Sequence, residues 1–357
     1  MKIKKLLVVP ADRIVMNNPN KLLYSGELIF YSDLPKILGK ENTYVYGTYS
    51  KHLLSDGLPK NCPYPSCHNA PLPTFVDESG VDDIISSVDV VLISILATRR
   101  GDHIKKKARQ YGKPIALFDF PDHETNYGSK NILKDLCHGN VLNEDYDLYF
   151  KKDLPLGYSS EFVLPIAPVP VRPESFDFKQ IDKKYSLFYS GRGHGPHAHS
   201  GYQKDRRQTV ELIRNNIKNV KFVCHDTNHT FMSMRQYWDS MSESRICLSP
   251  SGRVWDSFRH TETGLAPNTA LVAPKPWVHT VGPELVDGVN SILYDTELIG
   301  NKYSLVNKND LLEKINYYLE NPDECSKIAR KWSEDVMSGH TIYARSKYII
   351  ESIENKL

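Results

Sequence analysis

Residues 245–273 limit the fold of this chain more than any other stretch. They hold, in chain order, an expected strand at 246–248, a Ser-Pro-Ser-Gly loop at 249–252, a helix ending near 265 and a second strand at 269–273. Asp256 and Ser257 are both preferred N-cap residues, so the helix is expected to begin beside one of them. A strand, a tight polar loop, a helix and a strand make up half of a doubly wound nucleotide-binding unit.

The loop and the start of this helix suit a phosphate group. Serine and glycine before a helix N-terminus present backbone N–H groups and the positive end of the helix dipole. Arg253 and Arg259 lie within reach and can bind phosphate oxygens bidentately. Glu262, one turn into the helix, can accept hydrogen bonds from a ribose diol. A surface loop with a solvated helix is the alternative, but the combination favours a nucleotide site. The candidate binding residues of this stretch are Ser251, Gly252, Arg253, Ser257, Arg259 and Glu262.

Length and composition limit the class of protein. A chain of 357 residues suggests two domains of ordinary size. The net charge of +2 gives no global field that favours nucleic acid or an anionic membrane. The apolar run near the N-terminus is too short for a signal peptide, and no apolar run is long enough to span a membrane. The six scattered cysteines fit reduced thiols, so we expect a cytoplasmic protein.

Strands and helices alternate along both halves of the chain, which predicts an α/β fold. The first half has expected strands at 5–10, 44–49, 89–95, 114–120 and from 148, with helices at 28–38 and 102–111. The second half has expected strands at 185–189, 220–224, 246–248 and 269–273, with helices at 204–215, 231–242, 311–319, 325–337 and 343–353. Residues 50–82 are expected to form a long loop and the proline-rich residues 164–175 a domain linker.

Two acidic residues follow a predicted strand of the first half. Asp119 ends the strand at 114–120, and Asp122 lies just beyond it. Strand ends of this kind line the ligand crevice of open α/β sheets, so either carboxylate could act as a base toward a substrate. A loop-capping or N-cap role fits both residues equally well.

A glycine-rich loop follows the first strand of the second half. Gly191, Gly193 and Gly195 alternate there, which lets backbone N–H groups approach a ligand closely. Arg192 would then contact a diphosphate, and His194 is a candidate catalytic or phosphate-binding residue. A flexible, solvated loop is the alternative.

Metal ligands are a weaker prediction in two places. Cys62, Cys67 and His68 are three ligand types in one loop, but no partner pair with ligand spacing follows. His197 and His199 alternate with His194 in a Gly/Ser loop, a pattern more typical of solvated sequence. We therefore expect no metal at either place.

The second half resembles the donor-binding segment of the GT-B glycosyltransferases, closest to the exostosin-like and group 1 type. The resemblance rests on residues 248–272, with the Ser-Pro-Ser-Gly loop, Ser-Phe-Arg and the following glutamate, and on the pattern of 287–294. It implies two Rossmann-like, doubly wound domains facing a cleft. Their expected bounds are 1–165 for the acceptor side, 166–340 for the nucleotide sugar, and 341–357 for a helix that crosses back to the first domain.

The resemblance also implies roles for particular residues. Glu262 would bind the ribose, while Arg192, Arg259 and the loop of Ser251 and Gly252 would bind the diphosphate. Retaining members often carry a second glutamate eight positions earlier, where this chain has Val254. The stereochemical outcome therefore stays open.

The implied reaction moves a sugar from a nucleoside diphosphate, expected to be UDP, to an acceptor hydroxyl. Arg192, Arg253 and the helix N-terminus would stabilise the departing diphosphate. An inverting reaction needs a base near the acceptor, with Asp122 preferred over Asp119 because it lies past the strand. Fixed cations can replace a metal, so we expect a metal-independent enzyme with no cofactor beyond its co-substrate.

Other acceptors and functions remain open. A glycan is the expected acceptor, and a hydroxymethylated base in phage DNA is the alternative, with a basic track at Arg99-Arg100, 105–107 and Arg206-Arg207. Solvated helix faces explain those clusters better. Two rivals keep the fold: a GT-B-like sugar-nucleotide epimerase, and a non-catalytic nucleotide-binding protein.

Overall fold

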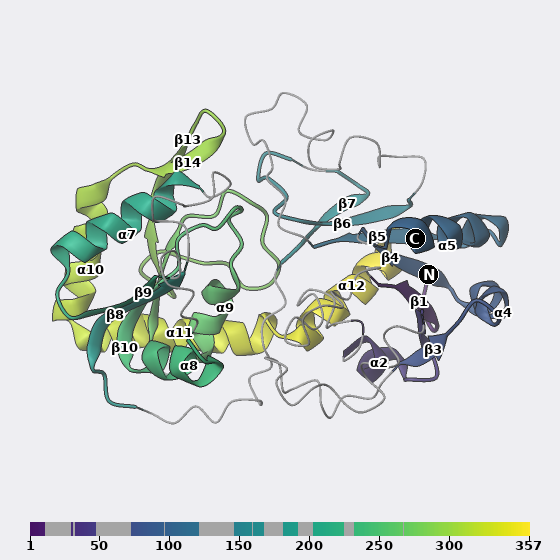
Figure 1. Ribbon diagram of the computed structural model, residues 1–357, viewed down its shortest axis with the longest axis horizontal. Helices are drawn as coiled ribbons and strands as arrows, with labels where there is room; N and C mark the ends of the chain where they lie inside the picture. The colour runs from purple at the N-terminus through teal and green to yellow at the C-terminus, as the bar shows by residue number, and fades with distance from the viewer. Residues whose placement is uncertain are drawn as a thin grey trace. The chain divides into compact units, whose positions relative to one another are not determined.

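The protein, seen in a computed structural model (Figure 1), divides into two compact units. The structure describes residues 1–10, 30, 33–47, 73–95, 97–120, 146–158, 160–167, 181–191, 203–224, 232–266 and 268–357. One unit contains the described residues of Met1–Pro121, Leu136–Ser175 and Thr341–Leu357, and the other contains those of Phe176–His340.

The first unit is built on a seven-stranded parallel sheet with the order β3-β2-β1-β4-β5-β6-β7. Its strands are β1 (Leu6–Val9), β2 (Thr43–Tyr46), β3 (Thr74–Val76), β4 (Val90–Ser94), β5 (Ile115–Asp119), β6 (Leu148–Lys152) and β7 (Val163–Ile166). Every residue of β1, β4, β5 and β6 is buried. This burial agrees with the predicted parallel sheet, whose two faces are both covered.

Helices cover both faces of this sheet. The helices of this unit are α2 (Asp33–Leu38), α4 (Val81–Ser87), α5 (Thr98–Gln110) and α12 (Ile342–Lys356). α4 and α5 share one core cluster with Leu7, Val91 and Ile115. On the opposite face, Tyr348 of α12 makes an edge contact with Phe150, and α12 packs against α2. The C-terminal helix is therefore part of the first unit.

The second unit contains a five-stranded parallel sheet with the order β12-β11-β10-β8-β9. Its strands are β8 (Tyr185–Gly191), β9 (Val220–Cys224), β10 (Ser244–Leu248), β11 (Ala270–Pro274) and β12 (Ile292–Tyr294). A separate antiparallel hairpin consists of β13 (Thr296–Ile299) and β14 (Lys302–Leu305).

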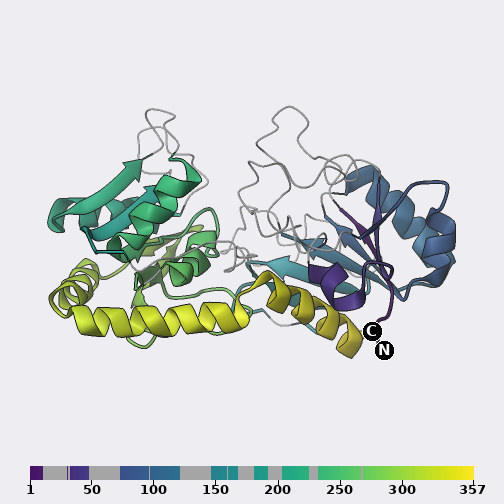
Figure 2. The ribbon, with the colours of Figure 1, turned by 90° about the horizontal axis from the view of Figure 1, so that it is seen from below.

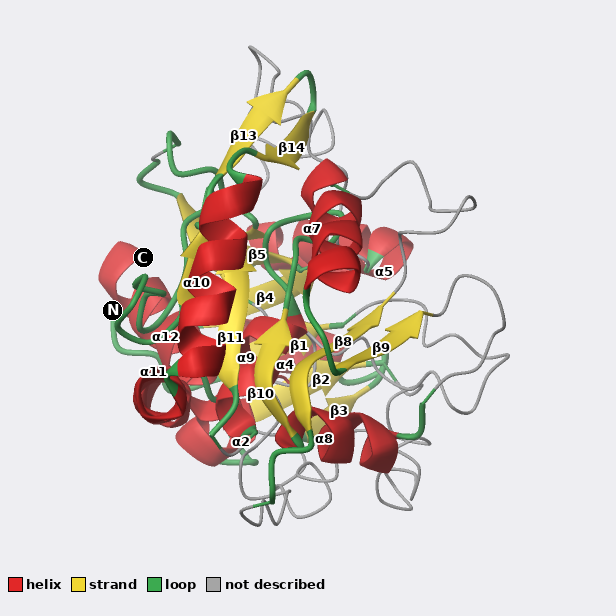
Figure 3. Cartoon of the chain, turned by 90° about the vertical axis from the view of Figure 1, so that its left-hand side faces the viewer, coloured by secondary structure: helices red, strands yellow, loops and turns green. Residues whose placement is uncertain are grey.

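The helices of the second unit again form two layers. They are α7 (Lys204–Asn216), α8 (Met234–Ser242), α9 (Phe258–Leu265), α10 (Lys308–Glu320) and α11 (Pro322–Gly339). α7 and α10 lie on one face of the sheet (Figure 3) and share a core cluster with alternate residues of its strands. α8 and α9 pack on the other face, and the long α11 runs below the sheet and packs against α9 (Figure 2).

The element pattern predicted from the sequence is confirmed for most of the described chain. Two expectations are wrong, and one hairpin was missed. Residues 50–82 contain the strand β3, the expected linker at 164–175 begins inside the strand β7, and the hairpin of β13 and β14 was not predicted at all. All of these strands have three or four residues, which is too short for a clear period-two pattern.

Candidate functional site

The topology of the second sheet singles out one edge. The chain passes from β8 to β9 on one side, whereas β10, β11 and β12 extend the sheet on the other side of β8. The order therefore reverses between β8 and β10. Ligands of open α/β sheets bind outside the carboxyl ends of the strands at such a switch point. Here those ends carry Ser190 and Gly191 of β8, and the Ser-Pro-Ser-Gly loop after β10.

This loop is anchored into the protein. Ser251 is fully buried, and both its backbone N–H and its hydroxyl donate to Asp205 Oδ2, at 3.2 and 2.9 Å. Tyr294 donates to the same oxygen at 2.9 Å. The N–H of Gly252 donates to the Val254 carbonyl at 2.9 Å. The expectation that these two N–H groups cradle a phosphate needs correction, since buried N–H groups must be paired and Asp205 and Val254 already pair them.

The start of α7 holds the other side of the loop. Arg206 Nε donates to the Ser251 carbonyl at 2.6 Å. The backbone N–H of Gln203 donates to the Gly252 carbonyl at 3.0 Å, and its side-chain amide donates to the Arg253 carbonyl at 2.7 Å. Arg206 is 7% exposed, so its side chain serves the loop rather than a surface. The partly buried side chain of Arg253 makes no hydrogen bond or ion pair within the described part of the chain.

α9 begins where the sequence predicts. Ser257 is its N-cap, and the serine hydroxyl accepts from the Arg259 N–H at 3.3 Å. α11 supports the helix from behind: Trp332 Nε1 donates to the His260 carbonyl at 2.7 Å. A Cβ on Gly264 would lie 2.5 Å from a methyl carbon of Val336, so only glycine permits this close approach. α9 is therefore rigidly placed at the carboxyl edge of the sheet.

Arg259 reaches from the first turn of α9 to the end of β8. One terminal nitrogen, Nη2, donates to the Ser190 carbonyl, and the guanidinium lies 5.3 Å from the centre of the Tyr189 ring. The other two nitrogens, Nε and Nη1, are buried and have no acceptor of good hydrogen-bond geometry within the described residues, although the Tyr237 side chain lies close to the guanidinium. A Cβ on Gly191 would lie 2.6 Å from the Tyr189 hydroxyl, so glycine is required beside this ring. The switch point thus holds a fixed cation with unused donors.

Glu262 lies one turn along the same helix. Its Oε2 accepts a hydrogen bond from the Tyr237 hydroxyl of α8 at 2.7 Å. Burial raises the pKa of Glu262 above its ordinary 4.5, against the opposing effects of the Tyr237 hydrogen bond and the charge of Arg259. Burial and the nearby carboxylate raise the pKa of Tyr237 well above 10, so its hydroxyl stays a neutral donor. No sequence signal predicts a role for Tyr237, which lies outside every motif.

The remaining predicted residues do not join this site. Asp119 is fully buried, forms an ion pair with Lys151 at 3.0 Å and accepts a hydrogen bond from the Tyr149 hydroxyl. These contacts are those of an internal structural pair, so we do not retain Asp119 as the acceptor base. Asp122, Arg192 and His194 lie outside the described residues, and their roles stay predictions.

Two further predictions concern metals and membranes. Among the described residues, no three His, Cys, Asp or Glu side chains gather as metal ligands. Cys62, Cys67, His68, His197 and His199 fall outside those residues, and metal independence stays a prediction. None of the described helices combines the length and apolarity needed to cross a bilayer.

Several cations of the basic track proposed for DNA are paired with acids or buried. Lys107 forms ion pairs with Glu78 and Asp82 at 3.2 and 2.9 Å. Arg207 pairs weakly with Glu211, and Arg206 is buried against the loop. These described side chains are therefore engaged within their own units.

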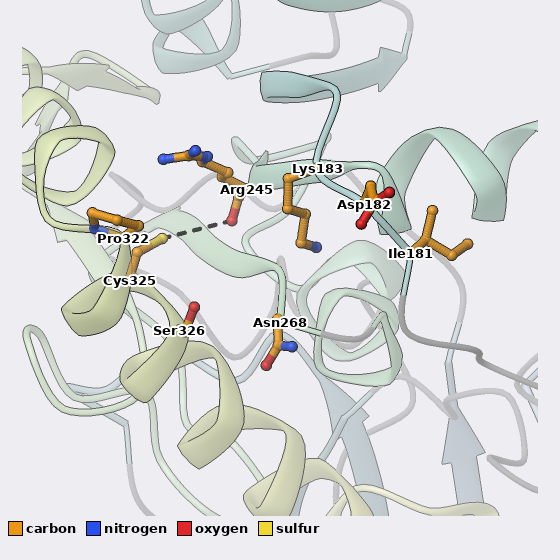
Figure 4. A pocket seen from close by; sticks show the side chains of 8 residues that line it. All are labelled: Ile181, Asp182, Lys183, Arg245, Asn268, Pro322, Cys325 and Ser326. Carbon is orange, nitrogen blue, oxygen red and sulfur yellow. Dashed lines mark hydrogen bonds between the residues drawn. The ribbon is translucent and has the colours of Figure 1, made fainter.

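A pocket of about 240 Å³ lies at the opposite, amino-terminal edge of the second sheet (Figure 4). Its lining includes Lys183, Arg245 and Cys325. The Lys183 ammonium donates to the carbonyls of Ser242 and Ser244 and to the Thr269 hydroxyl, at 2.8, 2.9 and 3.0 Å. These bonds use all three of its N–H groups, so Lys183 acts as a structural clamp.

Comparisons with known proteins agree with the fold. Residues 201–351 match the protein family described as glycosyl transferase-like. No curated protein matches the chain. Among solved structures, HepE of Anabaena in complex with UDP-glucose is 12% identical with a TM-score of 0.53, covering 98% of this chain and 99% of its own.

Two other solved structures are similar over nearly their whole length. A glycosyltransferase of Rickettsia africae is 11% identical, with a TM-score of 0.52 and 99% of each chain covered. An α,α-trehalose-phosphate synthase (UDP-forming) of Burkholderia xenovorans is 9% identical, with a TM-score of 0.50, covering 98% of this chain and 100% of its own. Identities this low show a shared fold, and neither the fold nor the family match favours the epimerase or the non-catalytic alternative. The fold is therefore that of the GT-B glycosyltransferases, as the sequence resemblance predicted, and residues 201–351 match the glycosyl transferase-like family.

Proposed function

We propose that the carboxyl edge of the second sheet binds a nucleoside diphosphate sugar, whose sugar the chain transfers to an acceptor hydroxyl. The observation that carries this proposal is Arg259. Its guanidinium is fixed by the Ser190 carbonyl and the face of Tyr189, and it keeps two buried nitrogens without an acceptor of good geometry in the described structure. A buried charged donor without an acceptor is costly, and diphosphate oxygens are suitable acceptors.

The start of α9 supports the same assignment. Its first turn holds no acidic residue, and Arg259 there adds positive charge to the positive end of the helix dipole. Such an arrangement is unfavourable on its own and favourable once an anion is bound. Because the departing diphosphate gains charge as the sugar leaves, these contacts would be strongest in the transition state.

Glu262 supports the ribose assignment. It lies three residues after Arg259, so the two side chains emerge from the same face of α9, about 5–6 Å apart at their Cβ atoms. A ribose diol and a diphosphate are neighbours in any nucleoside diphosphate. The carboxylate would accept from the diol while the guanidinium binds the phosphates.

The donor and the acceptor are the finer parts of the proposal. The HepE structure contains UDP-glucose, which supports a UDP-linked donor on the same fold. Arg192 and the loop at 192–195 would complete the diphosphate site, with His194 as an additional candidate. Asp122 stays our candidate for the acceptor base if the reaction inverts. The acceptor is proposed to be a glycan or another hydroxyl compound.

The test combines binding with turnover. We expect one of the UDP-, GDP- or ADP-linked sugars to raise the melting temperature, because a ligand that binds only the folded state stabilises it. With that donor, Arg259→Lys should lower kcat/KM by about tenfold or more, since lysine cannot bind two phosphate oxygens in a fixed fork. Arg330→Lys, at an exposed position of α11, is the matched control. A panel without any binder, or an Arg259→Lys variant as active as wild type, would refute the assignment.

A further inference from the structure

Tyr237 is a polar residue of the candidate site that no motif predicts. It lies on α8, on the helical layer that also contains α9. Its ring makes edge contacts with Phe188 of β8 and with Trp238, at centroid distances of 5.6 and 5.7 Å. Its hydroxyl donates to Glu262 at 2.7 Å. A rigid aromatic side chain therefore donates a hydrogen bond to one oxygen of Glu262, the carboxylate that we propose binds the ribose.

We propose that Tyr237 is a positioning residue for the nucleotide site. Its hydroxyl holds Oε2 of Glu262, so that the other oxygen, Oε1, is presented to the ribose diol. The inference rests on the proposed function, because it needs a ribose beside Glu262.

The geometry explains why such a support is needed. Glutamate has three rotatable side-chain bonds, and its terminal torsion is broad, so an unsupported carboxylate samples many orientations. Glu262 makes no other hydrogen bond among the described residues, which leaves Oε1 available. A side chain locked by packing and by a hydrogen bond from a neighbouring residue holds a binding group in the productive geometry.

Charge favours the same arrangement. The groups that face Glu262 are Tyr237 of α8, Arg259 of α9 and the thiol of Cys247 in β10. Burial opposes ionisation of the glutamate, whereas the tyrosine hydrogen bond and the arginine charge favour it. Loss of the hydroxyl should therefore raise the pKa of Glu262 further. Because only the ionised carboxylate accepts from both ribose hydroxyls, nucleotide affinity in the variant should decline at a higher pH than in wild type.

The experiment uses two probes that differ only in the ribose. The full chain, as wild type and as Tyr237→Phe, is titrated with UDP and with 2′,3′-dideoxy-UDP by calorimetry. We expect the variant to bind UDP about tenfold more weakly, the loss typical of a hydrogen bond to a charged group. Its affinity for the dideoxy probe should match that of wild type. Tyr317→Phe, at an exposed tyrosine of α10, should leave both affinities unchanged.

A double-mutant cycle and a pH series complete the test. In a Glu262→Ala background, Tyr237→Phe should cause little further loss, because both changes remove the same interaction. An equal loss for both probes, additive effects in the cycle, or an unshifted acid limit of UDP binding would overturn the role of Tyr237. If wild type binds neither probe, and no other donor of the panel, then the proposed function itself is wrong.

Discussion

Asp205 shows how one buried residue determines the shape of a functional loop. It is fully buried and accepts from the N–H and hydroxyl of Ser251 and from the Tyr294 hydroxyl. Asp205→Ala would leave three buried donors unpaired, and we expect it to lower the free energy of unfolding by about 2–4 kcal/mol. Denaturant unfolding measures the loss. Asp83→Ala, at an exposed position of α4, should change it by less than about 0.5 kcal/mol, and an Asp205→Ala variant as stable as this control would contradict the anchoring role.

Residues of the candidate site show which contacts a local sequence pattern can predict and which it cannot. Ser257 was among the predicted N-caps and is the observed one, because an N-cap depends only on the next two or three residues. The partners of Ser251 and Glu262 lie 46 and 25 positions away in the chain. No local pattern predicts such a pairing, so the sequence indicated the proposed binding residues Arg259 and Glu262 but neither the anchor Asp205 nor the proposed positioning residue Tyr237.

Among the elements, those with long apolar patterns were predicted and the short edge strands were not. β4 and residues 246–248 of β10 are largely apolar and central in their sheets, so their composition alone indicates a strand. β7 contains Pro165, which predicts a linker, yet an edge strand tolerates a proline because one side of its backbone needs no ladder partner. β3 is an edge strand of only three residues, and its pairing with β2 defines it more than its composition does.

Packing between α9 and α11 allows a prediction at the level of helices. Alanine normally stabilises a helix by about 1 kcal/mol relative to glycine. At position 264 the added Cβ would lie 2.5 Å from Val336, so Gly264→Ala should instead destabilise the protein by about 1–3 kcal/mol. The shift of the melting temperature in thermal unfolding shows whether Gly264→Ala stabilises or destabilises the protein. Val336→Ala in the same chain should restore part of the loss, whereas Gly80→Ala, where the nearest atom is 3.9 Å away, should be nearly neutral. A stabilised Gly264→Ala variant would show that the two helices can separate freely.

Across the whole molecule, the two units have separate cores. One core cluster joins α4 and α5 to the first sheet, and another joins α7 and α10 to the second. The last helix, α12, belongs to the first unit, where Glu354 accepts from the backbone N–H of Ile3 and from the N-terminal amine, each at 2.9 Å. The two ends of the chain are thus joined within the unit that does not contain the proposed nucleotide site.

This division predicts that damage to one core leaves the chemistry of the other intact. Ile353 of α12 and Ile315 of α10 are both fully buried, so replacing either with alanine should lower the free energy of unfolding of its unit by about 2–5 kcal/mol. Hydrogen exchange should show faster opening of the first unit in Ile353→Ala and of the second in Ile315→Ala. A saturating nucleoside diphosphate should restore protection in Ile315→Ala, because binding stabilises the unit that holds Arg259 and Glu262. The same ligand should not slow hydrogen exchange in the first unit of Ile353→Ala. Equal protection of both units by the ligand would show that they unfold as one.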